Sequence, residues 1–351
     1  MKKVVFLLLF VLISISNIAQ ENLRYGRDCY NRAQATEYND PTPFGLKDAA
    51  NSYAEALAPL QAAAKEGYGE ACYLLGNMYY YGKGTEKNDM LAMRMYQRAI
   101  EFGYDKGEAE LGLMYENGEN CTADPEKAFD LYNKSALKGN LYGKYMAARS
   151  LYFGIGTEKD FSKAVELFMS VYNSKHSFGK WYYQWTCVFL GDCYEYGRGV
   201  LPDTEKAVLY YMESDKPDAL YLAAKLIDSH DLRIPLNRNG NYYSRTHYIS
   251  KSNLLGKAID KGLDQAEAYY LFVKWNYAEN HYKGDITKAY ASSITQEYFS
   301  KILKSAEMGY GPAQKLLGDW YKEGKGTSIN LIKAREWYAK AKANGEKTPE
   351  L

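Results

Sequence analysis

The sequence predicts an all-α fold, an α-solenoid of about seven helical hairpins, and three observations carry that prediction. One pattern of small and aromatic residues returns about every 36 residues along much of the chain. An Asn or Asp stands at the same place in each copy, where a helix would begin, and a glycine stands where a helix would end. Because one hairpin cannot bury its own apolar face, such copies are expected to stack into a solenoid.

Each copy is expected to hold two helices. In the first copy Ala71, Leu75 and Tyr79 are spaced four apart, so they share one face of the first helix, and Gly82 follows as its stop. Gly76 has almost no side chain, which would let the second helix approach closely. The second helix begins after a residue whose side chain accepts hydrogen bonds from a first helical turn. These caps are Asn88, Asp124, Asp160, Asp203 and Asn330.

This pattern resembles the Sel1-like repeat, a relative of the tetratricopeptide repeat. The family pattern is roughly A-x-x-x-L-G-x-x-Y-x-x-G-x-G, then a cap, then K-A-x-x-x-Y-x-x-A-A-x-x-G. The resemblance covers most of residues 48–346. It implies an α-solenoid that serves as a scaffold for protein contacts, and it implies neither catalytic residues nor a cofactor. The matching stretches include Leu75-Gly76, Gly82-Lys83-Gly84, Lys127-Ala128, Lys163-Ala164, Lys206-Ala207 and Lys333-Ala334.

The chain is expected to divide into five parts. Residues 1–19 read as a signal peptide, and residues 20–67 as a divergent pair of helices that caps the stack. Residues 68–218 hold regular repeats, residues 219–310 hold divergent repeats with loop insertions, and residues 311–346 form the final repeat. We expect one continuous solenoid, because each repeat needs its neighbour to bury its apolar face.

The amino-terminal segment is typical of a secretory signal. Lys2 and Lys3 precede an apolar run from Val4 to Ile15, which is short for a membrane span, and cleavage is expected near Ala19. An uncleaved anchor is the alternative. We therefore expect a secreted or periplasmic protein with no membrane span after cleavage. The mature chain would carry 42 basic and 43 acidic side chains, a balance that does not favour nucleic-acid binding.

The chain has five cysteines, and an exported protein can form disulfides. Cys187 and Cys193 would lie about 9 Å apart along one helix, too far to bridge. We expect Cys72, Cys187 and Cys193 to be small buried residues, and a bridge involving Cys29 or Cys121 stays open. The cysteine-rich members of the resembling family carry paired cysteines in successive repeats. This chain does not, so the penicillin-related activity proposed for those members gains no support.

The first-helix positions that change from copy to copy are expected to line the concave side of the solenoid. Near the amino end of the repeats, four of these positions are tyrosines and would form an aromatic strip. Tyrosine offers a large contact area at little entropic cost, which suits binding. The alternative is that these rings pack between neighbouring helices. The expected binding residues are Tyr73, Asn77, Tyr80, Tyr145, Arg149 and Tyr152.

A second candidate binding site is the loop at residues 229–248, which interrupts the repeat period and is basic and aromatic. Loops held by a rigid scaffold often carry function. This mixture could hold an acidic peptide or a sugar by charge and stacking. The alternative is a solvated loop whose tyrosines pack back onto the solenoid. The expected binding residues are Arg233, Arg238, Tyr242, Tyr243, Arg245 and His247.

The sequence contains no recognisable catalytic or metal-binding motif. The four histidines, His176, His230, His247 and His281, fall in or beside the breaks in the period. Polar loops explain their placement, and a metal site built from two loops is the alternative. The stretch 82–85 lacks the ending of a phosphate-binding loop. We expect no catalytic residues, no metal and no cofactor.

The sequence therefore favours an exported, non-catalytic repeat scaffold that binds a protein or peptide partner. Two alternatives stay open. One is a cell-wall or carbohydrate-binding protein, with a glycan as the partner. The other is an envelope enzyme whose cleft lies in the irregular middle region. A nucleic-acid partner is not expected.

Overall fold

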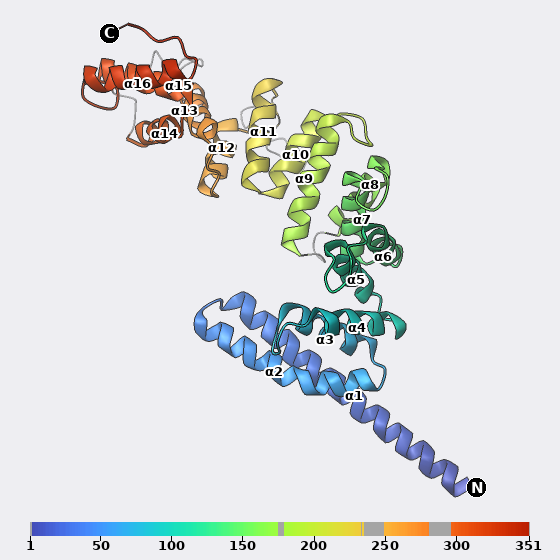
Figure 1. Cartoon of the computed structure of the whole chain (residues 1–351). Helices are drawn as coiled ribbons and strands as arrows, with labels where there is room; N and C mark the ends of the chain where they lie inside the picture. The colour runs from blue at the N-terminus through green and yellow to red at the C-terminus, as the bar shows by residue number, and fades with distance from the viewer. Residues whose placement is uncertain (1, 175–178, 233, 235–248, 281–295, 351) are drawn as a thin grey trace, which may run out of the picture. The chain divides into compact units, whose positions relative to one another are not determined.

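The computed structural model describes residues 2–174, 179–232, 234, 249–280 and 296–350 of the chain. Within these residues every regular element is an α-helix, and the helices pair into eight hairpins, the N-terminal pair and seven repeats (Figure 1). The predicted all-α solenoid of stacked hairpins is therefore confirmed. The helices are α1 (Lys2–Asn39), α2 (Pro43–Lys65), α3 (Gly69–Tyr81), α4 (Asp89–Glu101), α5 (Lys106–Asn117), α6 (Pro125–Leu137), α7 (Leu141–Phe153), α8 (Phe161–Tyr172), α9 (Lys180–Tyr196), α10 (Thr204–Ser214), α11 (Pro217–Ser229), α12 (Lys251–Asp260), α13 (Ala266–Asn280), α14 (Gln296–Glu307), α15 (Gly311–Glu323) and α16 (Leu331–Ala343).

The hairpins gather into two compact units. Unit 1 comprises residues 1–178, with helices α1 to α8, and unit 2 comprises residues 179–351, with helices α9 to α16. The expectation that both units belong to one continuous solenoid stays a prediction. The division falls where the repeat period breaks, and α9 has 17 residues against 13 in α3 and α7.

The predicted helix starts and stops are confirmed in the five regular repeats. Each cap side chain accepts a hydrogen bond of 2.9–3.0 Å from the backbone N–H three residues on, as Asn88 does from Leu91 and Asp124 from Lys127. The first helices end at a glycine with positive φ, for example Gly82 at 66°. Glycine adopts this left-handed conformation without steric strain. Local sequence therefore sets the length of both helices.

The two helices of each hairpin meet at a small residue in the middle of the first helix, called here the central small residue. In the first repeat it is Gly76, where a Cβ would lie 2.5 Å from the ring of Tyr96. The ring thus rests directly on the glycine backbone, in agreement with the predicted close approach. The central small residues are Gly76, Gly112, Ala148, Gly191 and Gly318. The equivalent second-helix residues are, in the same order, Tyr96, Tyr132, Phe168, Tyr211 and Tyr338.

Each unit has an apolar core of its own. Leu60 and Met78 are fully buried in unit 1, as are Leu255 and Ile302 in unit 2. In unit 1, α1 runs without a break from the expected signal segment into the first hairpin, and its N-terminal part extends past α2 (Figure 1). Among the residues that the structure describes, no helix is both long enough and apolar enough to cross a membrane.

All five cysteines are free thiols, so the bridge that the sequence left open is not formed. Cys72, Cys187 and Cys193 are buried, as predicted, and Cys29 is buried with them. Burial raises the pKa of the Cys72 thiol, and it raises that of Cys193 to about 12. Since the thiolate is the reactive form, these thiols are poorly suited to nucleophilic chemistry.

Candidate functional site

The expected tyrosine strip lies on two first helices of unit 1, α3 and α7. The helix α1 contacts α3, and α5 contacts α7. Tyr73 and Tyr80, on α3, are partly exposed. Tyr145 and Tyr152, on α7, are only 3% and 7% exposed, and the Tyr145 ring packs edge-on against Phe168. The α7 rings thus pack between helices, as the alternative interpretation had it. The exposed part of the strip is its α3 half.

A ladder of hydrogen bonds links the two helices within the hairpins. In four regular repeats the second-helix residue that packs on the central small residue is a tyrosine, called here the repeat tyrosine. Its hydroxyl donates a hydrogen bond to a first-helix side chain one or four positions after the central small residue. The third repeat has a phenylalanine, Phe168, and the corresponding positions hold Arg149 and Tyr152, neither of them a carboxylate or an amide. The first helix therefore carries an acceptor side chain only in the repeats whose second helix carries the tyrosine hydroxyl. The bonds are Tyr96 to Asn77 (2.8 Å), Tyr132 to Glu116 (2.9 Å), Tyr211 to Glu195 (2.8 Å) and Tyr338 to Asp319 (2.6 Å).

This ladder gives two of the expected binding residues structural contacts. Asn77 is 8% exposed and holds the Tyr96 hydroxyl. Arg149 reaches from α7 back to α5, where its guanidinium donates to both carboxylate oxygens of Glu116, at 2.8 and 3.3 Å. Such a two-pronged pair joins the second and third repeats with a fixed geometry. Arg149 remains partly exposed and can also contact a partner.

Tyr73 and Tyr80 lie in a polar and aromatic neighbourhood. The Tyr73 ring lies 6.2 Å from that of Tyr96 and 5.3 Å from that of Tyr104, centroid to centroid. The Tyr80 hydroxyl donates to Glu119 at 3.0 Å, which joins the first repeat to the turn that follows α5. These contacts orient both rings, which lowers the entropic cost of using them in binding.

Glu110 on α5 is a candidate site residue that the sequence analysis missed. It lies two positions before the central small residue of its repeat. The other regular repeats place an apolar side chain there, and three of the four are at most 7% exposed. Glu110 itself is partly exposed, and it makes no hydrogen bond or ion pair with any residue that the structure describes. Aligning the repeats with one another would have found it. The four apolar residues are Leu74, Met146, Phe189 and Leu316.

The unpaired Glu110 carboxyl has a shifted pKa and influences the pKa values of its neighbours. Burial raises the pKa of Glu110 to about 7. Its charge in turn contributes to raised pKa values at nearby tyrosines, after the larger effect of their own burial. A carboxyl of this kind is half ionised near neutral pH and lacks the partner that would normally stabilise its charge. The affected tyrosines are Tyr30, Tyr73, Tyr80, Tyr96 and Tyr132.

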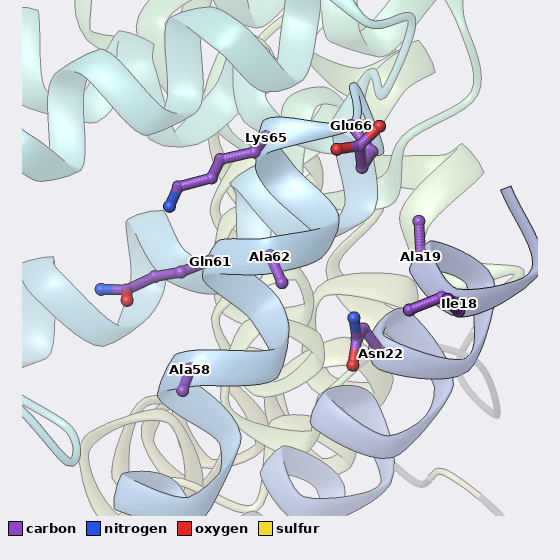
Figure 2. Close-up of a pocket in the computed structure, with 8 residues that line it drawn as sticks. All are labelled: Ile18, Ala19, Asn22, Ala58, Gln61, Ala62, Lys65 and Glu66. Carbon is purple, nitrogen blue, oxygen red and sulfur yellow. The ribbon is translucent and has the colours of Figure 1, made fainter. Parts of the chain in front are cut away.

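An open groove of about 430 Å³ lies between α1 and α2. Figure 2 shows that its lining comes from these two helices. Ile18 and Ala19 line it at the expected cleavage point, so removal of residues 1–19 would take away part of the α1 wall. The groove is therefore a weak candidate for a ligand site in an exported chain. The remaining lining residues are Asn22, Ala58, Gln61, Ala62, Lys65 and Glu66.

The second expected site, in the loop at 229–248, lies almost wholly outside the described residues, and so do all six of its expected binding residues. Its two ends are described. Ile234 and Ile249 are 5% and 8% exposed, and the Ile249 N–H donates to the Ile234 carbonyl at 2.9 Å. His230 is exposed at the end of α11, with Nδ1 2.9 Å from the Ser229 hydroxyl. The core of unit 2 thus holds the two ends of this loop together.

The described residues include no group of three or more His, Cys, Asp or Glu side chains placed to hold a metal ion. The face of unit 1 instead offers partly exposed tyrosine rings, one guanidinium and one unpaired carboxyl. These groups are suited to binding a polar and aromatic surface.

Comparisons with known proteins were made by sequence and by structure. The Sel1 repeat family matches residues 69–104, 106–140, 142–168, 186–211 and 311–346. An uncharacterized protein of Neisseria meningitidis is 25% identical over 309 residues, 88% of this chain and 56% of that protein. A chitin synthase regulator of Saccharomyces cerevisiae is 25% identical over 311 residues, 84% of this chain and 40% of that protein. The chain thus spans about half the length of these relatives.

A solved structure has the same fold. The protective antigen of uropathogenic Escherichia coli, which displays the Sel1-like repeat fold, superimposes with a TM-score of 0.57 at 21% identity, covering 90% of this chain and 68% of that one. At this identity the likeness concerns the fold alone. Five matched repeats, each with its cap, its central small residue and its glycine stop, show that the chain belongs to the Sel1 repeat family.

Proposed function

We propose that this protein is an exported, non-catalytic scaffold that binds a protein partner through the first-helix face of unit 1. Tyr73, Tyr80, Glu110 and Arg149 are its contact residues. The observation that carries the proposal is that these side chains come from three successive repeats and remain partly exposed, while α5 contacts α7 and Tyr80 of α3 is hydrogen bonded to Glu119 just after α5. Repeat proteins commonly use such an extended face for binding. The yeast relative is named as a regulator of an enzyme, which supports action through contact with another protein.

The test is a cross-linked pull-down from the native host, followed by binding measurements with the purified partner. We expect Tyr73→Ala combined with Tyr80→Ala to weaken binding at least tenfold. Tyr38→Ala is the matched control, because Tyr38 belongs to the same unit but is 86% exposed near the end of α1. Circular dichroism checks that each variant keeps its helices. Equal affinity of the double variant and the control for the partner would rule out this face.

The loop at 229–248 is the competing binding site. Since Ile234 and Ile249 are already hydrogen bonded to each other, residues 235–248 can be replaced by Asn-Gly, which favours a tight turn. We expect this deletion to leave partner binding unchanged if the unit 1 face is the site. Loss of partner binding with an unchanged melting temperature would move the site to the replaced segment, which holds Arg238, Tyr242, Tyr243, Arg245 and His247. The same variant on a glycan array tests the carbohydrate-binding alternative.

Export is tested separately. The charged start and the apolar run that follows motivate it, and cleavage near Ala19 would leave a chain that begins in the middle of α1. We expect amino-terminal sequencing of the protein from the envelope or the culture medium to begin at or near Gln20. An intact Met1 on protein recovered from the cytosol would overturn this part of the proposal.

A further inference from the structure

The strongest unexplained feature of the molecule is Glu110. Its position is apolar in the four other regular repeats, so an apolar residue there is compatible with the fold. Placing a carboxylate among packed helices without a hydrogen bond or counter-charge costs stability. Where a sequence breaks its own repeat rule with no compensating contact, function is the usual reason. Glu110 is the residue in this protein for which that argument is clearest.

The groups around Glu110 define what it can bind. Tyr73, on α3, lies near Glu110 and is partly exposed, so its ring can meet a ligand. The other tyrosines near Glu110 are buried and form the wall behind it: Tyr30 on α1, Tyr96 on α4 and Tyr132 on α6. Aromatic faces attract cations, and a carboxylate adds a full opposite charge. Lys106, one turn earlier on α5, does not neutralise Glu110, because its Nζ lies over the Tyr104 ring, 5.9 Å from the centroid.

The nearby acids already have partners of their own. Glu116 is paired with Arg149, and Glu119 accepts hydrogen bonds from Tyr80 and Asn117. Glu110 alone is without a partner in the described part of this face. An acidic peptide would meet repulsion here, and a neutral sugar would leave the carboxylate uncompensated.

We propose that Glu110, surrounded by the tyrosines of the first and second repeats, is the site that captures a lysine or arginine side chain of the partner protein. This inference rests on the proposed function, because it assigns the partner's chemistry to the same face. The partner's cation takes the place of the missing counter-charge, and the partly exposed ring of Tyr73 lies beside its aliphatic stem. Specificity follows from the cost of leaving Glu110 unpaired when the partner has no cation at this point.

The capture site makes binding depend on pH. The groups that face Glu110 are tyrosines, whose raised pKa values keep them neutral over the relevant range, so Glu110 itself sets the dependence. With a pKa of about 7, the carboxyl is mostly ionised at pH 8 and mostly protonated at pH 6. Since only the ionised form captures the cation, affinity falls roughly tenfold between these values.

The test uses the whole protein and an array of 12-residue peptides that differ only at a central Lys, Arg, Gln or Glu. We expect the native protein to prefer the Lys and Arg peptides at least fivefold at pH 8, and to lose most of that preference at pH 6. Glu110→Gln and Glu110→Leu should abolish it. Glu166→Gln, an exposed acid on α8 of the same unit, is the matched control and should bind as the native protein does.

A second measurement follows the Glu110 carboxyl directly by carbon NMR. A Lys peptide should lower the Glu110 pKa, and the Gln peptide should not. Equal peptide preferences in native protein and Glu110→Gln, or a Glu110 pKa unmoved by the Lys peptide, would overturn the inference. If Glu110→Gln keeps the natural partner while the Tyr73/Tyr80 variant loses it, the scaffold function stands and only the cation site fails.

Discussion

At the scale of single residues, each repeat tyrosine requires a hydrogen-bond acceptor on the first helix of its own hairpin. Tyr96 is 1% exposed, and its hydroxyl is satisfied by Asn77 at 2.8 Å. Tyr96→Phe would leave the Asn77 oxygen without that donor at a buried position. We expect a loss of about 1–2 kcal/mol in the free energy of unfolding, measured by urea denaturation. Tyr115→Phe is the control, since Tyr115 only accepts from the exposed Lys127, and it should stay within about 0.5 kcal/mol.

Glu110 gives a second prediction at this scale. Burial holds its pKa in the folded state at about 7, above the ordinary 4.5. The folded protein therefore binds more protons than the unfolded chain between these values, so this group makes the protein more stable as pH falls from 7 toward 4.5. In Glu110→Gln that contribution should vanish. The difference in unfolding free energy between variant and native protein should shrink on acidification, and a difference constant over this range would contradict the assignment.

The candidate site was predictable from sequence only in part, and single residues show why. Tyr73 and Tyr80 are partly exposed, whereas Tyr145 is buried and packs against Phe168, which replaces the tyrosine of the other repeats. The position of Asn77 differs from copy to copy, but its side chain is not free for binding, because it accepts a hydrogen bond from the Tyr96 hydroxyl on the other helix. Glu110 was not predicted because its signal is a charge in a position that is apolar in the other regular repeats, and that signal emerges only when the repeats are compared with one another.

At the scale of elements, the turns at Gly84 and Gly156 pack closely against the backbone of the preceding hairpin. Gly156, in the turn between α7 and α8, has φ of 66°, and a Cβ there would lie 1.9 Å from the carbonyl oxygen of Pro125 at the start of α6. Gly156→Ala thus combines left-handed strain with a backbone clash. We expect it to cost about 3 kcal/mol or more.

Gly139 supplies the control for that turn. Its φ is 89°, but a Cβ there would meet no atom within 4 Å. Gly139→Ala should therefore cost only the backbone strain, about 1 kcal/mol. Thermal unfolding of both variants measures the difference. If the two substitutions destabilise the protein equally, the turn does not act as an inter-repeat contact.

At the scale of the whole molecule, the sequence predicted the hairpins but not their division. Period, caps and glycine stops are local signals, so each helix could be placed from its own residues. The divergent repeats expected at residues 219–310 also form helix pairs, α11 with α12 and α13 with α14. Whether successive hairpins share one core depends on contacts between distant residues, and the pattern of one repeat does not contain that information.

The division into two units leads to a prediction about folding. Each unit has its own buried cluster, with Leu60 and Met78 in unit 1 and Leu255 and Ile302 in unit 2. Stability in repeat proteins is close to a sum of repeat and neighbour terms, so a compact set of four hairpins can be self-sufficient. We expect fragments 20–174 and 179–350 each to be helical by circular dichroism and to unfold cooperatively in urea. The intact chain should then show the transitions of both fragments. A fragment that stays unfolded alone but folds when mixed with the other would instead mean that the two units depend on each other for their stability.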